Sequence, residues 1–218
     1  MGLLFEPFML FVILFLPGAL GRTVLPAEIP ESTAAVAAFS SVRELTGILA
    51  YKLPALALIW YLLSGREAKK GRFPRFSCRD LWSVLAALPA LLLASLSVSL
   101  AASLFNAVPG GAPFESPPAE ISAWVLTILS CLSTGYLEES FFRYYLYKKL
   151  TLFGLDAPRF ILVSAALFSL CHLYEGPWGT LNACFAGLLL ALIFTRFRAL
   201  HGIALAHGLY NLLVYIAA

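Results

Sequence analysis

Apolar runs of about 20 residues follow one another along most of the chain, and they constrain its fold more than any other feature. A helix that spans a membrane needs about 20 mostly apolar residues. Seven segments meet this requirement, at about residues 3–20, 44–64, 81–106, 121–148, 159–174, 178–197 and 201–217. The sequence therefore predicts an all-α fold, a multi-pass transmembrane helical bundle of about seven spans.

The composition excludes an ordinary soluble domain. Of the 218 residues, 61% are hydrophobic and 12% are charged, whereas soluble domains average about 45–50% and about 25%. A lipid bilayer is the expected surrounding, and no nucleic-acid partner is expected. The four cysteines form no CxxC pair and show no metal-ligand spacing, so we interpret them as small packing residues. They are Cys78, Cys131, Cys171 and Cys184.

A segment rich in proline and glycine at residues 107–120 (AVPGGAPFESPPAE) divides the chain into two parts. Three predicted spans precede it, in residues 1–106, and four follow it, in residues 121–217. The segment is expected to be a non-cytoplasmic loop. The first span has the length of a signal peptide, but it lacks a basic start and carries Glu6 early, so we expect a retained helix.

Basic residues gather in alternate loops, which predicts the orientation in the membrane. Eleven cationic residues lie on one side and two on the other. The eleven are Arg66, Lys69, Lys70, Arg72, Arg75, Arg79, Lys148, Lys149, Arg159, Arg196 and Arg198, and the two are Arg22 and Arg43. By the positive-inside rule the basic side is cytoplasmic. We therefore expect a cytoplasmic amino terminus and an outside carboxyl terminus, in a bacterial inner membrane.

Three ionisable residues interrupt the fourth apolar run, and they are the strongest sign of function. Each ionisable group costs roughly 2.5–3.5 kcal/mol to insert at the centre of a membrane helix. Glu139 and Arg143 are four residues apart and can form a structural ion pair on one helix face. Glu138 has only Phe142 at that spacing, so it must take up a proton or find a partner on another helix. We therefore interpret Glu138 as a candidate general base or acid.

Two later runs carry further polar groups at similar depth. His172 follows Phe168 by four residues, so the phenyl ring can pack under the imidazole, and His207 precedes Asn211 by four. Each group alone is explained equally well by a hydrogen bond between helices. At about 1.5 Å of rise per residue, however, all lie in the inner half to middle of the bilayer together with Glu138. Matched depth on three helices suggests one shared cavity.

Hydrolysis is the chemistry that such a cavity supports. A carboxylate and a neutral imidazole can deprotonate a water, and a second histidine with an asparagine can stabilise an oxyanion. The chain has no HExxH zinc motif. Glu138, His172 and His207 remain an alternative set of ligands for a divalent metal such as zinc. We rank the metal second, since no two of them show ligand spacing on one helix, and expect no required cofactor.

The order of the three motifs resembles the CAAX protease and bacteriocin-processing (CPBP) family of intramembrane proteases, which includes the Ras-converting CAAX endopeptidase. The motifs are EESFFR at 138–143, FSLCH at 168–172 and HGLYN at 207–211. The resemblance covers roughly residues 120–217 and leaves the first three spans unmatched. It implies an intramembrane endopeptidase that acts on a membrane-associated, lipidated or C-terminally tethered protein.

The resemblance also implies a role for each site residue. Glu138 and His172 would activate the water, His207 and Asn211 would stabilise the oxyanion, and Glu139 with Arg143 would hold the site. Members of the family were long described as metalloproteases, and a metal-free mechanism based on glutamate is now favoured for the CAAX enzyme. The alternatives are a non-catalytic member that acts as a binding or immunity protein, and a small proton-coupled transporter, which Lys52 in the second span could serve. We expect Lys52 to reach an interface or to pair inside the bundle.

Overall fold

The computed structural model describes residues 2–19, 41–64, 74–105 and 120–217. Every element in these ranges is helical. In chain order they are α1 (Gly2–Leu14), α3 (Ser41–Thr46), η1 (Gly47–Lys52), α4 (Leu53–Ser64), α5 (Cys78–Leu104), α6 (Ile121–Glu139), η2 (Ser140–Tyr145), α7 (Leu146–Leu152), α8 (Ala157–Leu170), η3 (Leu173–Glu175), α9 (Gly176–Phe197) and α10 (Leu200–Ala217). The all-α expectation is confirmed.

The predicted spans correspond closely to the helices. Five helical segments are long and apolar enough to cross a membrane. They are Ser41–Ser64, Cys78–Leu104, Ile121–Leu152, Leu173–Phe197 and Leu200–Ala217. Two shorter apolar helices, Phe5–Ala19 and Ala157–Leu170, complete the expected seven. The predicted loop at 107–120 lies almost entirely outside the described residues, which resume at Glu120.

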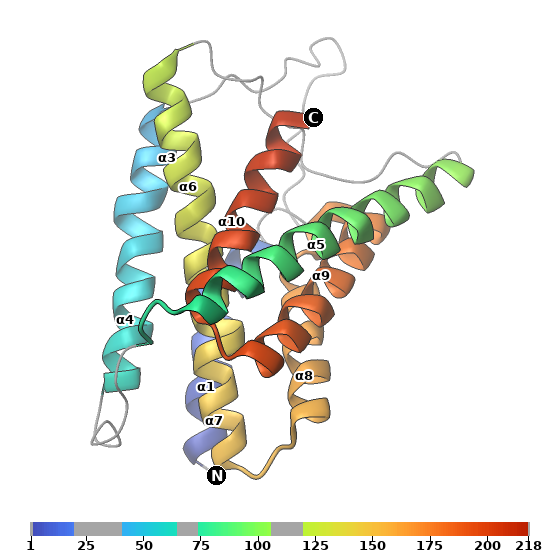
Figure 1. Ribbon diagram of the computed structural model, residues 1–218. Helices are drawn as coiled ribbons and strands as arrows, with labels where there is room; N and C mark the ends of the chain where they lie inside the picture. The colour runs from blue at the N-terminus through green and yellow to red at the C-terminus, as the bar shows by residue number, and fades with distance from the viewer. Residues whose placement is uncertain (1, 20–40, 65–73, 106–119, 218) are drawn as a thin grey trace.

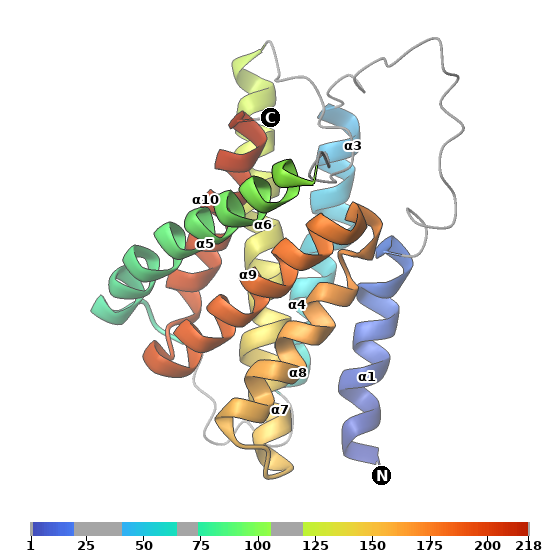
Figure 2. The same ribbon diagram turned by 90° about the vertical axis from the view of Figure 1, so that its right-hand side faces the viewer.

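The helices surround a central pair, α6 and α10, which the other helices cover from different sides (Figure 1). Helices α3 and α4 flank α6 on one side, and α1 stands beside α7. Helices α5 and α9 run obliquely across α10, and α8 lies along α9 (Figure 2). Helix α1 begins at the end of the bundle opposite to the end at which α10 finishes. The polar motifs on α6 and α10 therefore belong to the central pair, whereas the motif at the end of α8 belongs to a helix that packs on α9.

Small residues allow α6 and α10 to approach closely. A Cβ atom on Gly135 would lie 2.6 Å from the carbonyl oxygen of Ala204, and one on Gly208 would lie 2.9 Å from the Cα atom of Leu132. Contacts this short leave no space for a side chain. Because the two glycines lie close to the Glu138 and His207 positions in sequence, this packing brings both motifs together. Helices α9 and α8 also approach closely, since a Cβ on Gly187 would lie 3.1 Å from the Cα of Ala165.

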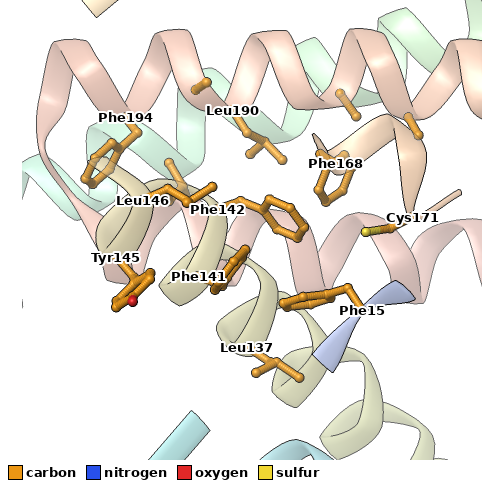
Figure 3. Packing of buried hydrophobic residues seen from close by; sticks show 14 of the residues in the cluster. Phe15, Leu137, Phe141, Phe142, Tyr145, Leu146, Phe168, Cys171, Leu190 and Phe194 are labelled. Atoms are coloured by element: carbon orange, nitrogen blue, oxygen red, sulfur yellow. The ribbon is translucent and has the colours of Figure 1, made fainter. Parts of the chain in front are cut away.

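An aromatic cluster fills the space around η2 (Figure 3). The ring of Phe15 lies 4.9 Å from that of Phe141 and 4.8 Å from that of Phe142, between ring centres. Phe142 in turn meets Phe168 of α8 edge-on at 5.3 Å. Offset and edge-to-face pairs of this kind add about 0.5–1.5 kcal/mol each beyond their buried area. Helix α1, which carries Phe15, is thus part of the core around the EESFFR motif.

A buried carboxylate fastens α5 to the start of α10. Asp80 is 1% exposed and accepts hydrogen bonds from the backbone N–H of Ser77 at 2.8 Å and of Gly202 at 2.9 Å. The first bond caps α5 and the second reaches across to α10. A Cβ on Gly202 would lie 1.9 Å from the hydroxyl oxygen of Ser83. Only glycine therefore fits at this crossing.

Two features of the helices differ from the sequence prediction. The run expected at 159–174 is helical only to Leu170, about 21 Å of helix, so His172 lies in the turn that follows rather than inside a span. The runs around Lys52 and Arg143 each contain a π-helical turn, η1 and η2. π-Helical turns are rare in proteins, and those that occur often lie at functional sites. The periodicity of hydrophobic residues does not reveal them.

Candidate active site

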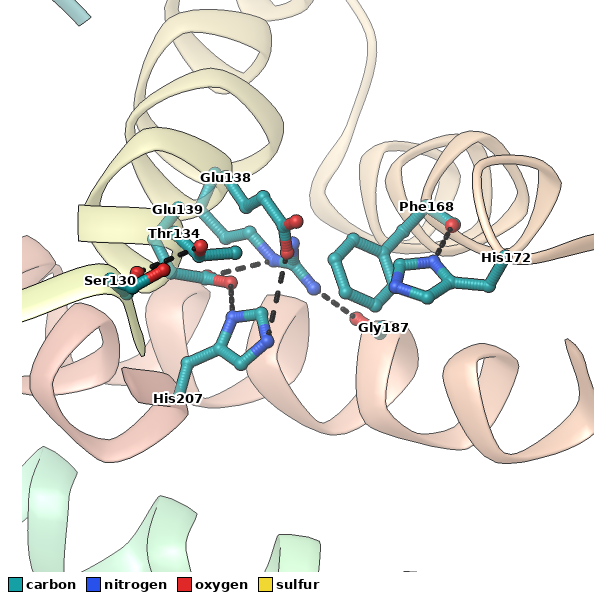
Figure 4. A network of polar contacts seen from close by, with 9 residues as sticks. Ser130, Thr134, Glu138, Glu139, Phe168, His172, Gly187 and His207 are labelled. Carbon is teal, nitrogen blue, oxygen red and sulfur yellow. Dashed lines mark hydrogen bonds and ion pairs between the residues drawn. The ribbon is translucent and has the colours of Figure 1, made fainter. Parts of the chain in front are cut away.

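Glu139, Arg143 and His207 form the buried centre of the polar network. Figure 4 shows Glu139 beside His207. Glu139 and Arg143 are each fully buried, and the predicted ion pair is present, with 3.1 Å between Arg143 Nε and Glu139 Oε2. The other oxygen of Glu139 accepts from Nδ1 of His207 at 2.8 Å. The carboxylate of Glu139 is thus shared between a guanidinium on η2 and an imidazole on α10.

Glu138 approaches the opposite edge of the same imidazole. Its Oε2 atom lies 3.6 Å from Nε2 of His207, and the side chain is 17% exposed. The two adjacent glutamates therefore flank one histidine, Glu139 at Nδ1 and Glu138 at Nε2. The sequence offered Glu138 no partner on its own helix, and its partner is His207 of α10. The Glu138 side chain is therefore partly exposed, in contrast to that of Glu139.

Arg143 lies among aromatic rings and backbone. Its guanidinium carbon is 4.6 Å from the centre of the Phe168 ring, and Nη2 donates to the carbonyl oxygen of Gly187 at 3.4 Å. Neither Nε nor Nη1 completes a well-directed hydrogen bond, although Nε is within ion-pair distance of Glu139. Charge attraction and the face of Phe168 therefore hold the guanidinium more than directional bonds do.

His172 stands on the other side of the Phe168 ring. The two rings lie 4.6 Å apart at a tilt of 37°, so the predicted packing is confirmed. Its Nδ1 lies 2.8 Å from the carbonyl oxygen of Phe168. A carbonyl can only accept, so the proton is assigned to Nδ1, and Nε2 is left as the basic nitrogen. Thr180 of α9 donates to the backbone carbonyl of His172 at 3.1 Å and fixes the turn.

The structure brings some of the predicted site residues together and keeps others apart. Phe168 links the groups, because its ring contacts His172 and, at 5.7 Å, His207. Among the described residues, no direct hydrogen bond or ion pair joins His172 to Glu138. Asn211 is half-buried and makes no hydrogen bond within the described part of the chain, while its neighbour Tyr210 accepts one from Asn182 at 3.0 Å.

The alternative metal ligands do not assemble into a metal site in this arrangement. Across the described ranges, no group of three or more His, Cys, Asp and Glu side chains is placed to hold a metal ion. Both histidines bind through Nδ1, His172 to the Phe168 carbonyl and His207 to Glu139, and each keeps Nε2.

One polar group near the site escaped the sequence analysis. Ser130 lies on α6 two turns before Glu138, and its hydroxyl and carbonyl both accept from Lys52 of η1, at 2.6 and 3.1 Å. Lys52 therefore reaches into the bundle. The signal was available in the sequence, since Ser130, Thr134 and Glu138 repeat every four residues and lie on one helix face.

The fold and the site together define a multi-span helical membrane protein with a buried Glu–Glu–Arg–His network. Residues 120–213 match the family model described as Rce1-like, type II CAAX prenyl endopeptidase. This match agrees with the resemblance of the three motifs to the CAAX protease (CPBP) family, and it supports a membrane-embedded endopeptidase in general. Comparisons with curated proteins and with solved structures gave no match.

Proposed function

We propose that the protein is an intramembrane endopeptidase that hydrolyses a peptide bond in a membrane-associated substrate by means of a water activated by Glu138 and His172. The observation that carries the proposal is the pair of adjacent carboxylates gathered around His207, within a domain that matches a protease family. The substrate is expected to be lipidated or tethered near its carboxyl terminus, because such a protein reaches a site inside the bilayer.

Glu138 and His172 activate the water, because each keeps a free basic atom. The Glu138 side chain is partly exposed, and Nε2 of His172 is free because Nδ1 is bound to the Phe168 carbonyl. A water between them would lose a proton as its oxygen attacks the substrate carbonyl carbon. The C–N bond then breaks, and the departing amine takes up that proton. The products are a carboxylic acid and an amine, so atoms and charge balance.

Stabilisation of the tetrahedral intermediate falls to His207 and Asn211. Nε2 of His207 donates to an oxyanion when it carries a proton, and Glu138 and Glu139 offset the positive charge of that imidazolium. The Asn211 side chain is half-buried, one turn after His207, and its amide is available as a second donor. Glu139 and Arg143 fix the imidazole in place. This mechanism requires no metal or other cofactor.

The proposed setting is a bacterial inner membrane, with the amino terminus in the cytoplasm and the carboxyl terminus outside. The described basic residues Lys148, Lys149 and Arg159 border the turn from α7 to α8, and Arg196 and Arg198 border the turn from α9 to α10. Both turns lie toward the end of the bundle from which α1 starts (Figure 1). This distribution supports a cytoplasmic location for that end.

The test is cleavage of a prenylated CAAX peptide by the protein reconstituted in liposomes. Glu138→Gln and His172→Ala should each lower kcat/KM by about 10²–10⁴, the usual contribution of a general acid or base. Glu120→Gln is the matched control, because Glu120 is exposed at the start of α6, and it should keep wild-type activity. Full activity of Glu138→Gln would overturn the mechanism, and an inactive wild-type protein would favour the binding or immunity role.

A further inference from the structure

The turn that carries His172 is fastened to α9 by a pair of reciprocal hydrogen bonds. The hydroxyl of Thr180 on α9 donates to the backbone carbonyl of His172, and the hydroxyl of Ser169 on α8 donates to the backbone carbonyl of Thr180, each at 3.1 Å. All three residues are half-buried. Thr180 lies outside the three sequence motifs, so its hydroxyl has no role in the proposed activation of water or in binding the oxyanion.

The position of His172 depends on α9 because α8 ends before it is reached, at Leu170. Phe168 orients the imidazole through its carbonyl and its ring, but both belong to α8 itself (Figure 4). The chain then turns at Gly176, whose φ of +75° favours glycine. The bond from Thr180 therefore ties the backbone of this turn to a second long helix.

Helix α9 also holds the other half of the site. The backbone carbonyl of Gly187 accepts from Nη2 of Arg143 at 3.4 Å. Arg143 in turn pairs with Glu139, the neighbour of Glu138. Thr180 and Gly187 are seven residues apart, which places them on one face of α9 and about 10.5 Å apart along its axis. One helix thus contacts the turn of His172 at one point and the partner of the glutamates at another.

Close packing keeps this face of α9 fixed against α8. A Cβ on Gly187 would lie 3.1 Å from the Cα of Ala165 and 3.3 Å from Cδ1 of Phe168. Interiors packed this closely resist small displacements of whole helices. The distance from His172 to the glutamates is therefore set by the point at which Thr180 holds the turn.

We propose that Thr180 is a positioning residue that holds His172 at the distance from Glu138 at which both groups share one water. The inference rests on the proposed function and adds to it a residue that acts through His172. Loss of the bond from Thr180 allows the turn to shift, and a shift of about 1 Å in a reacting group can lower a rate by about 100-fold. The effect falls on the chemical step, measured by kcat, rather than on substrate binding.

The test is the kinetics of cleavage of the prenylated CAAX peptide by variants in liposomes. Thr180→Val removes the hydroxyl at nearly constant volume and should lower kcat by about 10- to 100-fold, with KM within about twofold of wild type. Thr180→Ser keeps a hydroxyl and should restore most of kcat. Thr195→Val is the matched control, because Thr195 lies on the same helix and donates to the carbonyl of Leu192 in that helix at 2.8 Å. It should keep the wild-type kcat.

Thermal unfolding in detergent separates positioning from stability. Thr180→Val and Thr195→Val each lose one hydrogen bond and should have similar melting temperatures, while only Thr180→Val loses kcat. Ser169→Ala removes the return bond and should lower kcat by a smaller factor. The inference is overturned by an unchanged kcat or a much lower melting temperature in Thr180→Val, by an equal loss of kcat in Thr195→Val, or by no recovery in Thr180→Ser. These results would leave the proposed function intact, whereas absence of any cleavage by wild type would overturn both.

Discussion

The helices before residue 120 and those after it use polar residues in opposite ways. In the apolar windows of the two early spans, Ser41–Ser64 and Cys78–Leu104, 17% of the residues are buried, against 28–44% in the three later spans. The later helices assemble a continuous network around Glu139, whereas the early ones send single polar side chains inward. These single groups are Glu6, Lys52 and Asp80.

This difference indicates that the early and the later helices have different roles. The later helices are held together by close backbone packing and by charges that depend on one another, so a change at one position affects its neighbours. The polar contacts of the early helices are separate from one another. Substitutions in the later helices should therefore affect stability and activity together, while those in the early helices should affect one property at a time.

The largest effect is expected from Glu139→Ala. This change leaves Arg143 fully buried without its carboxylate and frees Nδ1 of His207. Removal of one partner of a buried ion pair typically costs about 3–5 kcal/mol, so we expect a large fall in thermal stability in detergent together with loss of activity. Arg159→Ala is the control, because its pair with Asp156 is 3.9 Å long and exposed. Similar losses from both changes would refute the contrast between buried and outer charges.

A smaller effect is expected from Gly135→Ala. The added Cβ would meet the Ala204 carbonyl at 2.6 Å, which forces α6 and α10 apart at a cost of about 1–3 kcal/mol. Because these helices carry Glu138 and His207, activity should fall as well. The counterpart in the early helices is Gly47→Ala, where nothing lies within 4 Å of the new atom. The thermal stability of the Gly47→Ala variant should not decrease. A decrease equal to that of Gly135→Ala would mean that the early and the later helices are packed equally closely.

The smallest effect is expected from Glu6→Gln, which tests how α1 is attached. Glu6 accepts from the hydroxyl of Tyr145 at 2.6 Å and pairs with Lys149 at 3.0 Å. The pair is partly exposed, and such pairs contribute about 1 kcal/mol or less. We expect a slight fall in thermal stability and unchanged kcat/KM for the prenylated peptide. Strong loss of activity without loss of stability would show that α1 contributes to catalysis directly.

Local sequence patterns predicted much of the fold and the residue types of the site. Apolar runs gave the positions of the helices, since length and hydropathy are local properties. The spacing of Glu139 and Arg143 predicted their ion pair, and the spacing of Phe168 and His172 predicted their stacking. The direction in which His172 and Asn211 point was not predictable in this way, because it depends on how α8 ends and how α10 is rotated.

The sequence by itself determined that this is a helical membrane protein with a CAAX protease motif set, because composition and short spacings carry that information. Only the tertiary structure decided that both glutamates flank His207, that Phe168 stands between the two histidines, and that Lys52 reaches Ser130. These contacts arise where helices cross at glycine positions and where π-helical turns rotate side chains. Such contacts join residues distant in the chain, and no local pattern of a single segment contains them.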